Sequence, residues 1–209
     1  MTTATLSTPR RASCGACLRA ESACICRFAT PVAASVELLV LQHPLEVRNA
    51  KNSARLLHLC LPGSRLLVGE AFLVSELEAA LHAGGRVPLL LYPQTAGEAA
   101  LGLPALPLVD ASLLARPEAL RLVLLDATWR KSRKMLYLNP ALQRLPRLAL
   151  QDLPPSAYRI RKAHAPDQLS SLEAAAHALS QLENRPEHYA PLFAAFDAFV
   201  EQQSRLFRA

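Results

Sequence analysis

The chain has 209 residues, of which 51% are hydrophobic and 19% charged, so it is not a disordered protein and can form one sizeable core. Its formal net charge of +6, from 23 basic and 17 acidic residues, favours a polyanionic partner such as a nucleic acid. No apolar stretch reaches the roughly 18 residues that a membrane-spanning helix needs, so no membrane association is expected.

The N-terminal residues 1–13 have the sequence MTTATLSTPRRAS and lack the apolar segment of a secretory signal. They are rich in Ser, Thr and Arg, as transit peptides of organelles are, but the first cysteine follows immediately and leaves little room for a targeting segment. We therefore interpret them as a flexible tail and expect a cytoplasmic location. In such a reducing compartment cysteines bind metal more often than they form disulfides.

Four cysteines follow this tail within thirteen residues, as Cys14, Cys17, Cys24 and Cys26. Four thiolates are the ligands that a structural zinc ion takes in a closed tetrahedron, and a CxxC pair is a common way to present two of them. The alternative, four unpaired core cysteines, fits poorly with so polar a segment. The spacing therefore predicts a zinc knuckle over residues 14–30, with a structural metal.

Apolar runs alternate with helical patterns through residues 31–209, which we expect to form one further domain. The predicted strands are residues 36–41, 65–68, 88–93, 121–126 and 147–150. The predicted helices are residues 49–60, 75–83, a segment starting near 128, residues 170–183 and a last helix that includes 189–207. Uniformly apolar strands that alternate with helices indicate an α/β fold with a mostly parallel sheet and helices on both faces.

Local signals mark several helix ends. Ser75 with Glu78 and Ser170 with Glu173 have the spacing of capping boxes, and Gly84-Gly85 is expected to end the helix after Ser75. In the last helix, apolar residues follow the i, i+3, i+4, i+7 rule, which indicates a core-facing stripe rather than a ligand site. The residues of this stripe are Tyr189, Leu192, Phe193, Phe196, Phe199, Val200 and Phe207.

Residues 94–117 show no clear pattern and are predicted to be irregular. Cys60 lies on an apolar helical face, where it is expected to be buried.

Two predicted strands end in residues suited to a ligand site, Asp126 in one and Tyr92-Pro93 in the other. Parallel α/β sheets bind ligands beyond the carboxyl ends of their strands. Asp126 is the only acid there, and three roles remain open: a general base, a group that orients a cationic ligand, and a helix N-cap. A free Asp has a pKa near ~4 and Arg130 or Lys131 would lower it further, so a base requires that burial raise this pKa.

Thr128 and Trp129 follow at the start of a predicted helix, whose free N–H groups suit a carboxylate or a phosphate. Trp129 either stacks on a base or fills the core. Cations cluster in three segments and are predicted to contact an RNA backbone, the alternative being a solvated helix face. They are Arg48, Lys51 and Arg55; Arg130, Lys131, Arg133 and Lys134; and Arg159, Arg161 and Lys162. Asn49 and Asn52 are suited to reading a base, and His43 is expected to be a hydrogen-bonded structural histidine.

Five motifs in this order resemble the DTW-domain family, and together they span about residues 14–185. They are the cysteine cluster, QHPLEVRNAKNSARLL (42–57), LLLYP (89–93), DATW (126–129) and YRIRKAHAPDQLSSLEA (158–174). The family is named for the residues that stand here as Asp126, Thr128 and Trp129. The chain departs from the family pattern at Ala127, where Gly is usual, and at Ser171, where Thr is usual; both changes are small.

The resemblance implies a tRNA-uridine aminocarboxypropyltransferase. Such an enzyme transfers the 3-amino-3-carboxypropyl group of S-adenosylmethionine to N3 of a uridine in tRNA, in the bacterial case in the variable loop, and releases methylthioadenosine. It also implies kinship with the knotted SPOUT-type RNA methyltransferases. Asp126 is then the candidate catalytic residue. The residues expected to bind the donor are Tyr92, Pro93, Asp126, Thr128, Trp129, Ser170, Ser171 and Glu173.

Two other functions remain open. An RNA methyltransferase would use the same cofactor and the same electrostatics. A non-catalytic RNA-binding protein with a zinc knuckle would explain the charge and the cysteines, but not an acid at the end of a buried strand. The nucleoside formed separates the three functions, and the sequence indicates no particular oligomeric state.

Overall fold

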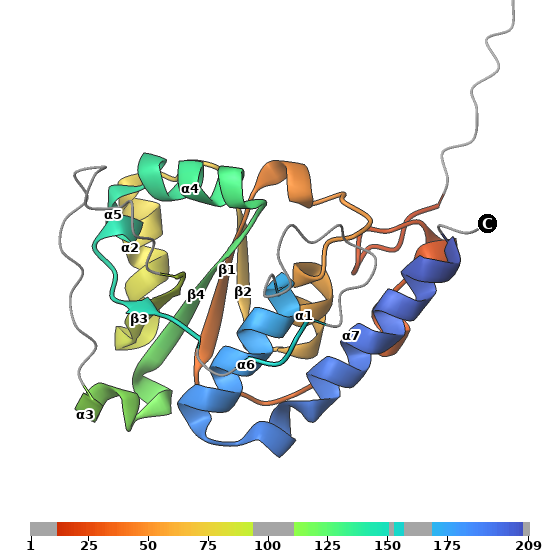
Figure 1. The fold of residues 1–209 in the computed structure, drawn as a ribbon. Helices are drawn as coiled ribbons and strands as arrows, with labels where there is room; N and C mark the ends of the chain where they lie inside the picture. The colour runs from red at the N-terminus through yellow and green to blue at the C-terminus, as the bar shows by residue number, and fades with distance from the viewer. Residues whose placement is uncertain (1–11, 94–110, 151–152, 157–168, 207–209) are drawn as a thin grey trace, which may run out of the picture.

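The computed structural model describes residues 12–93, 111–150, 153–156 and 169–206. At its centre lies a five-stranded sheet in the order β2-β1-β4-β3-β5, in which every neighbouring pair is parallel (Figure 1). The strands are β1 Glu37–Gln42, β2 Arg65–Val68, β3 Val87–Leu91, β4 Leu120–Asp126 and β5 Arg147–Leu148. The predicted parallel α/β sheet is confirmed. β5 is shorter than expected because its partner β3 ends at Leu91, which pairs with Leu148.

Helices cover both faces of the sheet. They are α1 Ala54–Cys60, α2 Val74–His82, α3 Ala111–Leu114, α4 Trp129–Leu138, α5 Pro140–Gln143, α6 Ser171–Glu183 and α7 Pro186–Leu206. Short 3-10 helices are η1 Glu21–Ala23, η2 Cys26–Phe28, η3 Pro44–Glu46, η4 Ala83–Gly85 and η6 Pro117–Ala119. Within the described residues, no helix is long and apolar enough to cross a membrane.

Alternate residues of the central strands belong to two separate cores. Leu122 and Leu124 pack in the core that contains α1, α6 and α7. Val123 and Leu125, which point the other way, pack in the core that contains α2, α4 and α5. Because side chains alternate across a strand, burial on both faces requires the continuous apolar run that the sequence shows.

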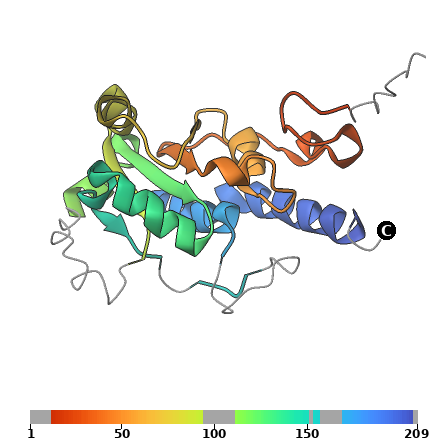
Figure 2. The ribbon, with the colours of Figure 1, turned by 90° about the horizontal axis from the view of Figure 1, so that it is seen from above.

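The N-terminal knuckle lies beside the C-terminal half of α7 (Figures 1 and 2). Cys17 and Ile25 are buried in the same core as α1, α6 and α7. Gln202 of α7 donates a hydrogen bond from Nε2 to the Cys24 carbonyl oxygen at 3.1 Å. The knuckle is thus attached to the body of the protein by apolar and polar contacts.

Two of the predicted helix starts are wrong. The helix expected from residue 49 begins at Ala54, because the preceding loop makes tertiary hydrogen bonds through Asn52 and Ser53. α2 begins at Val74, with Leu73 as its N-cap, and no side chain caps it. The expected Ser75–Glu78 capping box is absent, since Glu78 pairs with Arg144 and His82 instead.

Other expected features are present. Gly84 and Gly85 have φ values of 68° and 69° and end α2, a conformation that glycine adopts at little cost. The Ser170–Glu173 capping box is formed, and Cys60 is buried. The apolar stripe of α7 is buried at Tyr189, Leu192, Phe196, Phe199 and Val200, and Phe193 is partly buried. Phe207, residues 1–11 of the tail and residues 94–110 of the expected irregular segment lie outside the described residues, whereas residues 111–114 of that segment form α3.

Candidate functional site

Asp126 lies at the carboxyl end of β4, in the middle of the sheet, and only 3% of it is exposed. Its Oδ2 accepts hydrogen bonds from Gln42 Nε2 at 2.8 Å and from Asn52 Nδ2 at 2.5 Å. Its Oδ1 accepts one from Ser171 Oγ at 2.6 Å. All three donors are neutral, so the carboxyl group is well hydrogen-bonded but has no counter-ion among the described residues.

Burial raises the pKa of Asp126 above the ordinary value of an aspartate. The hydrogen bonds from Ser171, Gln42 and Asn52 oppose this rise, and the nearby charge of Glu46 adds to it. The lowering expected from Arg130 or Lys131 is therefore not the dominant effect. The N-cap interpretation of Asp126 is also wrong, because Thr128 occupies the N-cap of α4.

The loop between β1 and α1 contributes a second buried acid, Glu46, of which 6% is exposed. Its Oε1 lies 2.9 Å from Lys131 Nζ, and its Oε2 accepts a hydrogen bond from Asn49 Nδ2 at 2.7 Å. Neither Glu46 nor Gln42 is among the site residues predicted from the sequence. The available signal was that Gln42 ends a buried strand just as Asp126 does, and the two are direct partners in the sheet register.

Two cavities meet at Ala127 and Ser171, which line both of them. The larger has a volume of about 330 Å³ and is mostly apolar; its lining includes Leu91, Tyr92, Pro93, Leu124, Trp129, Ser132, Leu148, Leu150, Leu169, Ser170 and Ala174. The smaller has a volume of about 150 Å³ and is polar; its other lining residues are Glu46, Asn49, Lys51, Asn52, Ser53, Asp126 and Thr128. Both lie at the carboxyl edge of the sheet, where parallel α/β sheets bind ligands.

The structure places all the predicted donor-site residues except Glu173 in the lining of one or both cavities. Glu173 lines neither: its carboxylate accepts hydrogen bonds from the Ser170 backbone at 2.8 Å and from Ser156 Oγ at 2.9 Å. Trp129 is 47% exposed, so the interpretation that it fills the core is wrong. Its ring stands edge-on to Tyr92 at 5.7 Å, and that it stacks on a base stays a prediction.

The predicted RNA-binding cations have different environments. Arg130, Arg133 and Arg48 are exposed, and Lys134 is exposed although it pairs with Glu70 at 2.9 Å. Lys131 is largely covered and bound to Glu46, and Lys51 lines the smaller cavity, so these two belong to the site itself. Arg55 is half-buried. Arg159, Arg161 and Lys162 lie outside the described residues.

Three polar side chains of the loop after β1 form hydrogen bonds with other groups of the protein. His43 is 5% exposed; its Nδ1 accepts from the Leu45 backbone at 3.1 Å and its Nε2 lies 3.1 Å from Glu70 Oε1, which confirms the structural role. Asn49 bonds to Glu46, and Asn52 donates to Asp126. The two amides therefore hold carboxylates, and that they read a base stays a prediction.

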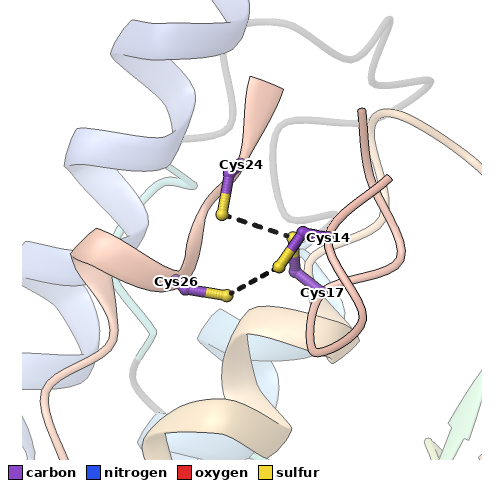
Figure 3. Close-up of side chains that lie close together, drawn as sticks. All are labelled: Cys14, Cys17, Cys24 and Cys26. Atoms are coloured by element: carbon purple, nitrogen blue, oxygen red, sulfur yellow. Dashed lines mark hydrogen bonds between the residues drawn. The ribbon is translucent and has the colours of Figure 1, made fainter. Parts of the chain in front are cut away.

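The four knuckle cysteines point toward one another, and their sulfur atoms all lie within 4.8 Å of each other (Figure 3). Cys14 Sγ lies 3.6 Å from Cys26 Sγ, and Cys17 Sγ lies 3.8 Å from Cys24 Sγ. A tetrahedral ion with Zn–S bonds of about 2.3 Å has S···S edges of about 3.8 Å, so the cluster has the size of such a site. These residues can hold one metal ion.

The knuckle is connected to Asp126 through Arg19. The guanidinium group of Arg19 donates hydrogen bonds to the carbonyl oxygens of Ala50 at 2.7 Å and Asn52 at 2.9 Å, and it stacks over the ring of Phe199 at 4.9 Å. Asn52 is the residue whose side chain donates to Asp126. The cysteine knuckle therefore supports, through Arg19, the loop that holds the buried acid.

The amino-acid sequence is similar to a known family and to several curated proteins. The family model of the DTW domain matches residues 11–204. The protein "tRNA-uridine aminocarboxypropyltransferase 2" of Drosophila melanogaster is 34% identical over 184 residues, which cover 85% of this chain and 69% of the relative. The proteins of the same name from Mus musculus and Macaca fascicularis are 33% and 30% identical over 83% of this chain, which spans 57% of their length. No solved structure gives a match.

Proposed function

The chain belongs to the DTW-domain family, and on this premise we propose that it is a tRNA-uridine aminocarboxypropyltransferase. It transfers the 3-amino-3-carboxypropyl group of S-adenosylmethionine to N3 of a uridine in tRNA, in the variable loop if it acts as the bacterial enzymes do. The relatives named above carry this activity in their names. The observation that carries the proposal is the buried carboxyl group of Asp126 between two cavities.

Asp126 suits the proton transfer that this reaction needs. Uridine N3 is a poor nucleophile while it is protonated, and burial gives Asp126 a pKa above that of a free aspartate, which makes it a stronger base. In the proposed step N3 attacks the γ-carbon of the donor, the carbon–sulfur bond breaks, and its electron pair stays on sulfur in methylthioadenosine. The N3 proton passes to Asp126, while Gln42, Asn52 and Ser171 keep the carboxylate in place.

The larger cavity suits the nucleoside part of the donor. Its lining is mostly apolar, and the edge-on pair of Tyr92 and Trp129 offers aromatic contact for an adenine ring. The guanidinium group of Arg147 lies 5.2 Å from the centroid of the Tyr92 ring and fixes it from another direction. The sulfonium then lies toward Ala127 and Ser171, next to Asp126.

The spent donor tests this proposal. After incubation of the purified chain with S-adenosylmethionine and tRNA, chromatography should find methylthioadenosine, because the four-carbon group leaves and the methyl group stays on sulfur. An RNA methyltransferase would release S-adenosylhomocysteine instead. An RNA-binding protein without activity would leave the donor intact, and either of these outcomes would refute the proposed function.

The exposed arginines of α4 are proposed to contact the tRNA backbone. Changing Arg130 and Arg133 to Ala together should weaken tRNA binding. The slope of log K against log salt, which is negative, should become shallower by about 1.4–1.8, since each phosphate contact contributes about 0.7–0.9 to its magnitude. Arg65 and Arg116, exposed arginines next to the amino ends of β2 and β4, provide the matched control at the opposite edge of the sheet. Equal salt slopes for both double variants, or a parallel loss of S-adenosylmethionine binding, would contradict this placement.

We propose further that the metal of the knuckle is zinc, which the sulfur spacing of 3.6–3.8 Å and the all-thiolate ligand set support. The division into a knuckle at residues 14–30 and a catalytic domain at 31–209 stays a proposal, as does a cytoplasmic location. Kinship with the knotted SPOUT enzymes is supported by one feature of the topology. After the edge strand β5 the chain returns to mid-sheet, where Ser171 contacts Asp126 and the Leu172 N–H bonds to Ser53.

A further inference from the structure

The smaller cavity contains charged groups that proton transfer at Asp126 does not explain. It is lined by two buried acids, Glu46 and Asp126, and by the cation Lys51. We infer that it is a subsite for a zwitterionic α-amino acid group. On the proposed function, on which this inference rests, that group is the end of the four-carbon chain of S-adenosylmethionine. Glu46 binds its ammonium group and Lys51 binds its carboxylate, while Asp126 stays available for the N3 proton.

Glu46 is the strongest indication of such a role. A buried carboxylate is costly unless it is paired, and a hydrophobic residue at the same place is often at least as stable. Here Lys131 and Asn49 hold the two oxygens of Glu46 at 2.9 and 2.7 Å, beside the cavity. The Lys131 side chain is itself only 24% exposed. Stability alone does not explain such a pair beside a cavity, whereas a charged ligand in the cavity does.

The charges of the cavity discriminate between the two groups that the reaction must bring to Asp126. Uracil is neutral and becomes an anion when N3 loses its proton, so a pocket with two carboxylates disfavours it. An α-amino acid group carries one positive and one negative charge, which match Glu46 and Lys51. The smaller cavity therefore suits the amino acid end of the donor, and the uridine must approach Asp126 from outside it.

The arrangement of the two cavities supports the same assignment. They share Ala127 and Ser171, so a ligand that occupies both passes directly beside the Asp126 carboxyl group, to which Ser171 Oγ is bonded at 2.6 Å. A donor with its nucleoside in the larger cavity and its amino acid end in the smaller one places the sulfonium cation there. Binding both charged groups of the chain fixes the γ-carbon, at which the bond must break.

Calorimetric binding of three ligands to the purified chain tests the inference. S-adenosylmethionine has both charged groups, decarboxylated S-adenosylmethionine lacks the carboxylate, and methylthioadenosine lacks the whole chain. Glu46→Gln should weaken S-adenosylmethionine and its decarboxylated form by roughly 10-fold or more, the usual loss for a charge-assisted hydrogen bond, and leave methylthioadenosine unchanged. Lys51→Met should weaken S-adenosylmethionine alone.

Glu78→Gln and Arg144→Met serve as matched controls, because this exposed ion pair between α2 and the end of α5 lines neither cavity. Both should leave the affinity for all three ligands unchanged. If Glu46→Gln does not fold, Lys51→Met still decides, since Lys51 is a half-buried loop residue.

Three outcomes would overturn the inference. Equal weakening of S-adenosylmethionine and methylthioadenosine by Glu46→Gln would make Glu46 a structural residue. Unchanged donor affinity in both variants would exclude the subsite. A raised KM for tRNA with unchanged donor affinity would assign the cavity to the uracil. These results are separate from failure of the proposed function, which would appear as S-adenosylhomocysteine, or no spent donor, in the wild-type reaction.

Discussion

The Asp126→Asn variant is expected to lose at least ~100-fold in turnover, the lower end of what a general base supplies, and to melt at or above the wild-type temperature. Burial raises the pKa of Asp126, so the folded state favours the protonated acid. At neutral pH, above the ordinary pKa, ionisation therefore lowers the free energy of unfolding, and an amide removes that penalty. Gln42 Oε1 is buried and has no hydrogen-bond partner among the described residues, so after a flip of the Gln42 amide it can accept from the new amide.

The raised pKa of Asp126 also leads to an expected pH dependence of the reaction. A base must be ionised, so wild-type turnover should rise with pH through the raised pKa of Asp126, and the residual turnover of the variant should lack that rise. Asp197→Asn, a change at an exposed acid of α7, is the matched control for turnover and melting temperature. Near-normal turnover in Asp126→Asn would remove this residue from the mechanism.

Removal of the metal is expected to have the second large effect. Elemental analysis of the purified chain should find about one zinc per molecule, since four thiolates complete one tetrahedron. Cys17→Ser should abolish metal binding and lower the melting temperature by about 6–12 °C, as a loss of about 3 kcal/mol does in a domain of this size. The reason is that Cys17 and Ile25 anchor the knuckle in the core beside α7. Folded, active protein without metal would contradict the zinc assignment.

The Arg19→Met variant tests whether the knuckle supports the Asp126 site independently of metal binding. The substitution removes the two hydrogen bonds to Ala50 and Asn52 but none of the four sulfur ligands. It should leave the zinc content unchanged and lower turnover by roughly 10-fold, because Asn52 no longer holds Asp126 in one position. Arg27→Met, at an exposed knuckle arginine that stacks on Phe28, is the control that should leave turnover unchanged.

The interior strands β1, β3 and β4 and the position of Asp126 could be predicted from the sequence because a strand buried on both faces needs a continuous apolar run. Leu120–Asp126 is buried along its whole length, and its one acid marks the carboxyl end. The spacing of the four cysteines indicated their cluster in the same local way. Such features depend on residues that are neighbours in the chain.

The contacts of Asp126 could not be predicted, because its partners come from distant parts of the chain. Gln42, Asn52 and Ser171 lie 84, 74 and 45 residues away from it in the sequence, and only the packing of β1, its loop and α6 brings them together. Glu46 was missed for the same reason, since its partner Lys131 is 85 residues away. The capping box at Ser75 failed because a distant arginine, Arg144, attracts Glu78.

The most direct test of the proposed transfer follows a heavy-carbon label from the donor into tRNA. The purified chain is incubated with tRNA and S-adenosylmethionine labelled in the four-carbon chain, or in a parallel reaction in the methyl group, and the nucleosides are analysed by mass spectrometry. We predict a uridine derivative that carries the label of the four-carbon chain on N3 and never the methyl label. A methylated nucleoside with the methyl label, or tRNA without label in both reactions, would contradict the account.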